Sequence, residues 1–164
     1  ILCTLRAKEN KTMCATGIHR YLAVETYEEV VHFLSRWRRV KDEGSRTGLY
    51  TGDFSTMYTT IPHAALFDSI EACTREAYDF EAKGLGLDPS NICLESSGSV
   101  CRWVRASKSS HGPNSHRMTC KDLNALVRFL VSNTFLCNGK SIYRQKIGIP
   151  MGTNCAPVLA NLLL

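Results

Sequence analysis

Acidic residues are scarce in the second part of this 164-residue sequence. Beyond Glu95 the only carboxylate is Asp122, while nine Lys and Arg follow position 95. Residues 1–95 hold 11 Lys and Arg against 14 Asp and Glu, so the two parts carry net charges of −3 and +8. Such a surface attracts polyanions because few acids oppose its cations. Composition leaves two alternatives equal, a nucleic-acid partner and a basic surface that serves solubility.

The sequence also lacks long apolar runs and paired cysteines. No charged segment followed by an apolar core opens it, and no run is long enough to span a bilayer, so we expect neither secretion nor membrane insertion. The eight cysteines form no CxxC pair and most lie in apolar segments, which favours free thiols in a reducing, intracellular compartment. The chain begins at Ile1 without a methionine and ends on VLANLLL, so we expect a fragment of a longer protein.

A zinc site is conceivable at four residues in the second half, Cys101, His111, His116 and Cys120. The gaps between them match no familiar zinc-ligand spacing, and the segment that separates them is loop-like. We therefore expect no metal there.

The first half of the chain carries several signals of regular structure. Residues 1–24 hold two weak strand signals, ILCTL and IHRYLAV. Thr26 and Glu29 have the spacing of a helix capping box. Farther on, TGLYTGDFS predicts a short strand, and Pro62 stands where another helix can begin. Apolar residues recur at helical spacing in both helices: Val30, Phe33, Leu34 and Trp37 in the first, and Leu66, Ile70, Cys73 and Ala77 in the second.

The second half alternates loops with short elements. Residues 83–99 are rich in Gly, Ser, Asp and Pro and predict a loop, SVCRWVRA predicts a strand with Trp103 in the core, and SKSSHGPNSH predicts a basic loop. Thr119 and Asp122 form a second capping pattern, before a helix with Leu123, Leu126, Val127 and Leu130 on one face. Two β-prone runs around Asn138-Gly139 then predict a hairpin turning at these two residues, both with positive φ. A Gly- and Pro-rich loop leads into a last helix.

Two stretches carry residues suited to chemistry. In TGDFSTMYTTIPH, Asp53 ends a predicted strand beside Gly52, where a carboxylate could hold a hard cation against a substrate phosphate. Tyr58 follows five positions later and could form an apolar wall against a sugar ring. In KIGIPMGTNCAPVLANLLL, Gly148 and Gly152 let the backbone approach a base or phosphate closely. Taken singly, the first could be a turn or cap, and the second an ordinary connection.

Together and in this order, about ninety residues apart, DFSTMYTTIP and QKIGIPMGTNCAPVLANL resemble motifs A and B of the reverse transcriptase palm. The nearest likeness is to Penelope-like retroelements and the related telomerase reverse transcriptases. In this family, motif A is an Asp, four residues, an aromatic and a nearby Ile-Pro, and motif B is a G-x-P-x-G loop running into a helix. The hairpin before motif B also matches.

The resemblance implies a role for each matching residue. Asp53 would be the first catalytic carboxylate and would bind two Mg²⁺ ions, or Mn²⁺, with the carbonyl of Phe54 as a further ligand. Backbone amides of Thr56 and Met57 would face the triphosphate of a deoxynucleotide. Tyr58 would exclude a ribose 2′-hydroxyl, and Met151 and Gly152 would contact the nucleotide. An RNA template and a DNA primer would lie along Arg144, Lys146, Gly148 and Pro150.

The sequence departs from the family in three places. Met151 stands where many retroviral enzymes have a glutamine that hydrogen-bonds the nucleotide. The aromatic-x-Asp-Asp hairpin of motif C is missing, because no acid follows Asp122. The basic motifs of the fingers are not recognisable in residues 1–24, where Lys8, Lys11 and Arg20 are available. His63 receives no catalytic role.

The implied fold is α+β: a polymerase palm, with an antiparallel sheet packed on helices and part of the fingers, truncated before the motif C hairpin. One partial reverse transcriptase domain would fill residues 1–164: an upstream segment (1–48), the motif A strand and helix (49–83), a variable connection (84–118), and the helix, hairpin and motif B (119–164). A nuclear location is expected. The alternative is a non-catalytic nucleic-acid-binding domain, a decayed or co-opted palm that keeps the fold without the chemistry.

Overall fold

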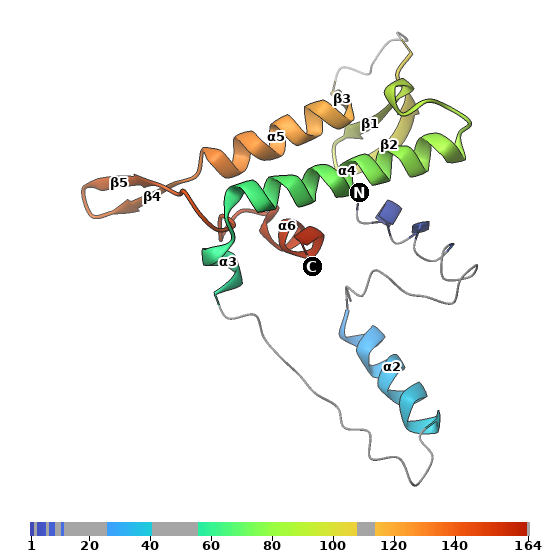
Figure 1. The fold of residues 1–164 in the computed structure, drawn as a ribbon, viewed down its shortest axis with the longest axis horizontal. Coiled ribbons are helices and arrows are strands. Elements are labelled where there is room, and N and C mark those ends of the chain that lie inside the picture. Colours follow the sequence, from blue (N-terminus) through green and yellow to red (C-terminus); the bar gives the residue numbers. More distant parts are fainter. Residues whose placement is uncertain are drawn as a thin grey trace.

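The computed structural model describes residues 1, 3–5, 7, 8, 11, 26–40, 56–107 and 114–163, with the backbone alone at 37–40 and 57. Two long helices lie side by side, and a small sheet covers one end of the pair while a hairpin extends from the other (Figure 1). The elements are α2 (Tyr27–Val40), α3 (Met57–Thr60), α4 (His63–Gly84), the 3₁₀ turn η1 (Pro89–Asn91), β1 (Ile92–Ser97), β2 (Val100–Arg105), β3 (Ser115–Met118), α5 (Cys120–Ser132), β4 (Phe135–Asn138), β5 (Ser141–Arg144) and α6 (Ala156–Leu163).

Helix α4 is the centre of the described structure. It begins directly after Pro62, as predicted, because the fixed φ of proline suits the entry to a helix. Its apolar face packs against α5 and α6. Leu66, Ile70 and Ala77 are buried as predicted, and Cys73 is half-buried. The full set of buried residues on this helix is Leu66, Phe67, Ile70, Thr74, Ala77, Tyr78 and Ala82.

Helix α5 begins where it was predicted to begin, but the face that it buries differs from the predicted one. The Thr119 hydroxyl accepts from the amide of Asp122 at 3.2 Å, and the Asp122 carboxylate accepts from the amide of Thr119 at 2.9 Å. The stripe that packs inward contains Leu123, Val127 and Val131. Leu126 and Leu130, expected on the same buried face, are exposed. Two apolar stripes overlap on this helix, and only the position of α4 decides which is covered.

The three-stranded sheet lies where a connection was expected. Its antiparallel order is β2-β1-β3, and β1 occupies part of the predicted loop 83–99. Strand β3 likewise occupies the end of the predicted loop SKSSHGPNSH, whose residues 108–113 lie outside the described structure. Strand β2 confirms the prediction for SVCRWVRA. Trp103 packs edge-to-face on buried Tyr78 of α4, with ring centroids 4.7 Å apart, so it belongs to the core as predicted.

The hairpin β4–β5 is confirmed, with its turn one residue later than predicted. Asn138 pairs with Ser141, so Gly139 and Lys140 are the turn residues. Gly139 has φ +59°, whereas neither Asn138 nor Lys140 has a positive φ. Glycine at the first turn position is the arrangement of type II′ turns, which fit the strand twist as well as the Asn-Gly type does.

Residues near the N-terminus are helical where a strand was expected. Residues 3–5 are helical, and the amide of Leu5 donates to the carbonyl of Ile1 at 2.9 Å. Leu5 packs against Ala77 of α4 and Leu162 of α6. Lys8 forms an ion pair with Glu76, and the Lys11 ammonium lies 4.8 Å from the centre of the Phe80 ring. These two lysines therefore serve packing on α4 in this structure.

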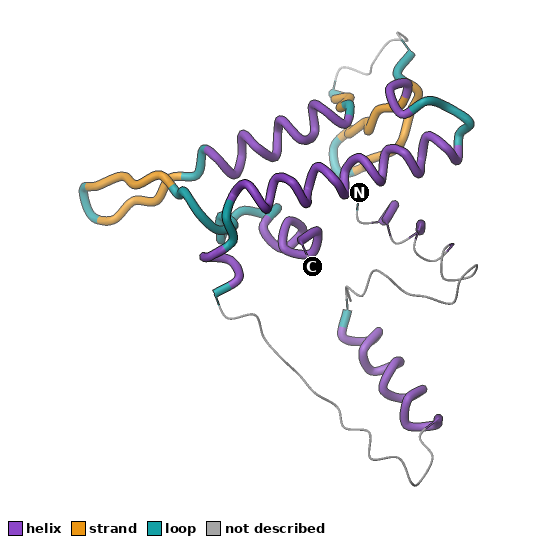
Figure 2. Tube along the Cα trace, viewed as in Figure 1, coloured by secondary structure: helices purple, strands orange, loops and turns teal. Residues whose placement is uncertain are grey.

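Helix α2 confirms the element predicted after Thr26. Its residues Val30 and Phe33 are exposed, and Figure 2 shows the helix apart from the other described elements. The chain is thus a mixed α+β structure with small antiparallel sheets. The strand predicted at 47–55, which carries Asp53, lies outside the described residues, as does the segment IHRYLAV.

Candidate functional site

The two stretches singled out in the sequence are in direct contact. The amide of Gly148 donates to the carbonyl of Ile61 at 2.7 Å, and the amide of Ile149 donates to the carbonyl of Tyr58 at 2.7 Å. Pro62 and Ile147 form an antiparallel β-bridge beside them. The chain segment after Asp53 and the glycine loop are therefore joined by backbone hydrogen bonds across about ninety residues of sequence.

Gly148 makes this contact possible. Its φ is +86°, and a Cβ at this position would lie 2.3 Å from the carbonyl oxygen of Tyr58 and 2.9 Å from the Cα of Thr59. Both neighbours are backbone atoms, which cannot move aside as a side chain can. Glycine is required here for close approach as well as for backbone conformation.

His63 adds a side-chain contact to the same junction. Its Nε2 lies 2.9 Å from the carbonyl oxygen of Gly148, and because a carbonyl can only accept, the ring must donate through Nε2. The ring also packs against Phe67, with centroids 5.8 Å apart. No catalytic role was predicted for His63. Its one sequence signal was the position after Pro62, which places it in the first turn of α4, beside the start of the site.

The segment before this junction has an unusual backbone. Thr56 adopts a left-handed conformation with φ 61°, which is costly for a β-branched residue. Its carbonyl oxygen accepts from the amide and the hydroxyl of Thr59, at 2.8 and 2.9 Å, and from both groups of Thr60. This strained turn starts α3 and places half-buried Tyr58 against the core beside Ile149. Met57 is described by its backbone alone.

The glycine loop divides its residues between core and solvent. Gly148, Ile149 and Pro150 are buried, whereas Met151 is 67% exposed and Gly152, with φ +91°, has open space around its Cα. The Thr153 hydroxyl donates to the carbonyl of Pro150 at 2.8 Å and closes the turn. The loop thus has an anchored half, which shapes it, and an exposed half, which can meet a ligand.

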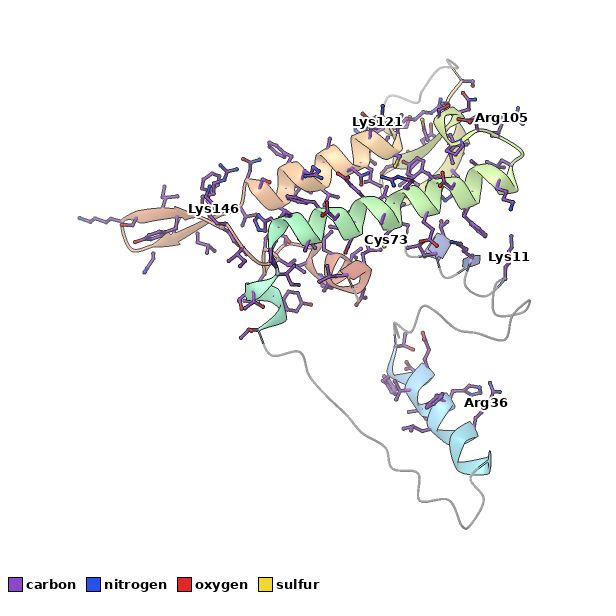
Figure 3. All side chains as sticks on the ribbon, in the orientation of Figure 1. Lys11, Arg36, Cys73, Arg105, Lys121 and Lys146 are labelled. Carbon is purple, nitrogen blue, oxygen red and sulfur yellow. The ribbon has the colours of Figure 1, made fainter. Side chains whose placement is uncertain are left out.

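Arg144 and Lys146 are exposed beside this loop. Arg144 Nε donates to the carbonyl of Ser132 at 2.6 Å, which fixes the stem of the side chain at the base of the hairpin. Lys146 lies where the hairpin meets the body of the molecule (Figure 3). The two exposed cations therefore precede the anchored half of the loop along the chain.

Asp53 and Phe54, the predicted metal ligands, lie outside the described residues. Within the described ranges, no group of three or more His, Cys, Asp or Glu is arranged to hold a metal ion. Of the four residues considered for a zinc site, Cys101, His116 and Cys120 are described, and His111 lies outside the described residues.

All seven cysteines that the structure describes are free thiols. Burial raises the pKa of Cys73, Cys93 and Cys120, which lowers their fraction of reactive thiolate at neutral pH. These three residues therefore act as small apolar side chains.

Comparison with known proteins finds no match: no protein-family model fits the chain, and no curated protein or solved structure is similar to it. Among the helices of the described residues, none has the length and apolar character needed to cross a bilayer.

Proposed function

We propose that the chain is the core of an RNA-directed DNA polymerase and that it carries motifs A and B of a reverse transcriptase palm of the Penelope-like kind. The observation that supports this most is the backbone pairing of residues 58–62 with residues 147–149. Two loops that resembled the motifs by chance would have no reason to meet. A palm requires them to meet, because one motif holds the metal and the other supports the nucleotide.

In this proposal the chain's own residues position a nucleotide. Tyr58, held at its carbonyl by Ile149, presents its ring to the sugar and excludes a 2′-hydroxyl. Exposed Met151 and Gly152 contact the incoming base pair through apolar surface and backbone. Thr56 and Met57 approach the triphosphate from the start of α3. Template and primer follow Arg144 and Lys146 through phosphate contacts that carry no sequence information.

Asp53 and the carbonyl of Phe54 would hold Mg²⁺, or Mn²⁺, at the triphosphate. Two such ions would activate the primer hydroxyl and stabilise the leaving pyrophosphate. A single carboxylate is too few for two ions, and the chain has no acid after Asp122. We therefore expect no primer extension by this 164-residue chain, only metal-dependent binding of a nucleotide. The parent protein would act in the nucleus, where a DNA primer is available.

The test is calorimetric titration of dGTP with Mn²⁺ into the chain and into Asp53→Asn, which keeps the size of the side chain and removes its charge. Asp68→Asn is the matched control, because Asp68 is an exposed acid on α4. The proposal predicts manganese-dependent binding that Asp53→Asn weakens at least about tenfold and Asp68→Asn leaves unchanged, since the charge holds the ion. Nucleotide binding that does not depend on Mn²⁺, or that is equally strong in Asp53→Asn, would refute the proposal.

The absence of acids after Asp122 also favours the second candidate, a palm that binds nucleic acid without catalysis. In that case RNA binding is unaffected by Mn²⁺ and by Asp53→Asn, and no nucleotide binds. The dGTP titrations separate the two candidates, because only the first predicts manganese-dependent binding of a nucleotide.

A further inference from the structure

The hairpin β4–β5 exposes an apolar surface that no described element covers. It projects from the end of the paired helices in Figures 1 and 2, and every residue of both strands is exposed. Phe135 and Tyr143 are both 56% exposed, and Ile142 is 72% exposed. Isolated two-stranded hairpins gain little stability from packing. Large exposed apolar groups on such an element are typical of a binding surface.

The cross-strand register separates two faces of the hairpin. Phe135 pairs with Arg144 and Cys137 pairs with Ile142, so these four side chains share one face. Leu136 and Tyr143 share the other face with Asn138 and Ser141. An aromatic ring thus lies directly opposite a guanidinium on one face only. We name the face with Phe135, Cys137, Ile142 and Arg144 the cationic face.

The charge around the cationic face has one sign. Residues 123–164 contain four Lys and Arg and no Asp or Glu. Of these, Arg128 is paired with Glu71, whereas Arg144 and Lys146 have no acidic partner among the described residues. The amide of Gln145 donates to the carbonyl of Thr134 at 2.9 Å, which extends the ladder past Arg144. The alternation of an extended strand then places Lys146 on the same side as Arg144.

We propose that the cationic face binds single-stranded nucleic acid, with a base stacked on Phe135 and the neighbouring phosphates at Arg144 and Lys146. An exposed ring beside cations is the combination that such ligands require, because every base has a face for stacking and every phosphate has a charge. A duplex fits less well, since its bases are already stacked. A second copy of this chain would bring like charges together on this face.

The proposal rests on the proposed function and extends it. The hairpin runs directly into the Ile147–Gly152 loop, and the Gln145 side chain donates to the carbonyl of Ile147 at 2.9 Å. A nucleic-acid strand bound on the cationic face would therefore reach the candidate site by following the protein chain from the hairpin into the loop. In a polymerase this strand is the unpaired template.

The experiment compares two aromatic residues of the same hairpin with equal exposure. Binding of the intact chain to a fluorescent single-stranded RNA of mixed sequence is measured for wild type, Phe135→Ala, Phe135→Tyr and Tyr143→Ala. We expect Phe135→Ala to weaken binding at least about fivefold, the loss of one stacked base, while Phe135→Tyr and Tyr143→Ala stay within about twofold of wild type. Equal losses for Phe135→Ala and Tyr143→Ala, or no loss for either, would overturn the proposal.

Two further measurements identify the ligand. Lys146→Gln should reduce the slope of log affinity against log salt by about 0.7, the share of one phosphate contact on a single strand. Phe135→Ala should leave the binding of a blunt RNA duplex unchanged. An unchanged salt slope would contradict the phosphate contact. Sedimentation tests the alternative occupant. If the wild-type chain is a dimer, Phe135→Ala is a monomer and both bind RNA equally well, the cationic face binds a second copy of the chain instead.

Failure of this proposal can be told apart from failure of the proposed function. Asp53→Asn should leave single-stranded RNA binding unchanged, because the cationic face requires no metal. If RNA binds at Phe135 but no nucleotide binds with Mn²⁺, the polymerase proposal is refuted and the proposal for the cationic face stands. If a nucleotide binds with Mn²⁺ but Phe135 contributes nothing to RNA binding, only the proposal for the cationic face is refuted.

Discussion

The carbonyl oxygen of Tyr58 accepts a 2.7 Å hydrogen bond from the amide of Ile149, and a Cβ at the preceding Gly148 would lie 2.3 Å from the same oxygen. This contact joins the residue proposed to select the sugar to the loop proposed to support the base pair. A change in either backbone would be transmitted to the other, because both are packed on α4 and its core.

Gly148→Ala should destabilise the protein by about 2 to 4 kcal/mol, through a positive φ and a clash with backbone. Gly152→Ala is the matched control, since Gly152 also has a positive φ but open space around it. It should cost only about 1 kcal/mol. Urea unfolding of the two variants measures the difference. Equal losses would mean that the close approach to Tyr58 is not tight in solution.

His63→Phe should loosen the junction by about 1 kcal/mol, because it keeps a ring beside Phe67 and loses the donor to Gly148. Hydrogen exchange at the amide of Ile149, which bonds to Tyr58, is the direct measurement. Exchange should become faster in His63→Phe and stay closer to wild type in His63→Gln, which retains an amide donor. Identical exchange in all three proteins would show that the His63 contact does not hold the loop.

The sheet depends on Glu95, which lies on the central strand β1 and is 3% exposed. Its carboxylate accepts from Arg117 of β3 at 2.9 Å and from Arg102 of β2 at 2.7 Å. Glu95→Gln should therefore destabilise the protein. Arg117→Ala should cost more than Arg102→Ala, because the Arg117 side chain is 16% exposed and that of Arg102 is 71% exposed. The reverse order would argue against this account of the sheet.

These contacts also predict a dependence on pH. Hydrogen bonds from Arg117 and Arg102 lower the pKa of Glu95 below its usual value of 4.5. A carboxyl whose pKa is lowered by folding contributes stability that is fully present above its unfolded pKa and lost as the pH falls through the folded pKa. Unfolding midpoints measured from pH 7 downward should thus fall more steeply below about pH 4.5 in wild type than in Glu95→Gln. Parallel curves would contradict the assignment.

Tyr58→Ala should abolish any preference for dGTP over GTP in manganese-dependent binding, whereas Tyr58→Phe should keep it. The reason is steric: the ring, not the hydroxyl, would meet the ribose 2′-oxygen. Paired titrations of the two nucleotides into each variant provide the comparison. A preference that survives in Tyr58→Ala would assign sugar selection to another residue.

Local signals in the sequence predicted local structure well. Thr119 and Asp122 fixed the start of α5, and Pro62 marked the entry to α4, because caps and proline act within one turn of helix. The hairpin was also predicted, but Gly139 took the first turn position where Asn138 had been expected. Asn-Gly and Gly-Lys turns are both compatible with the flanking strands, and neighbouring residues alone do not choose between them.

What escaped prediction depends on tertiary contact. Strand β1 was missed because its apolar start, Ile92 and Cys93, is short and lies among loop-forming residues; it is stable because Tyr78 and Ala82 of α4 cover it. The buried stripe of α5 could not be chosen without knowing where α4 lies. The sequence linked the stretches that contain Tyr58 and Gly148, and the structure shows these two stretches in backbone contact, whereas the His63 contact was visible only in the structure.

The most direct test of the central claim asks whether a metal held by Asp53 lies beside the Tyr58–Gly148 junction. Mn²⁺ with dGTP is added to the ¹⁵N-labelled chain, and paramagnetic broadening of the backbone amide signals is recorded in wild type and in Asp53→Asn. We predict broadening at residues 56–58, 148, 149, 151 and 152 in wild type, its loss in Asp53→Asn, and sharp signals throughout β2. Broadening that is centred elsewhere, or that persists in Asp53→Asn, would contradict the account.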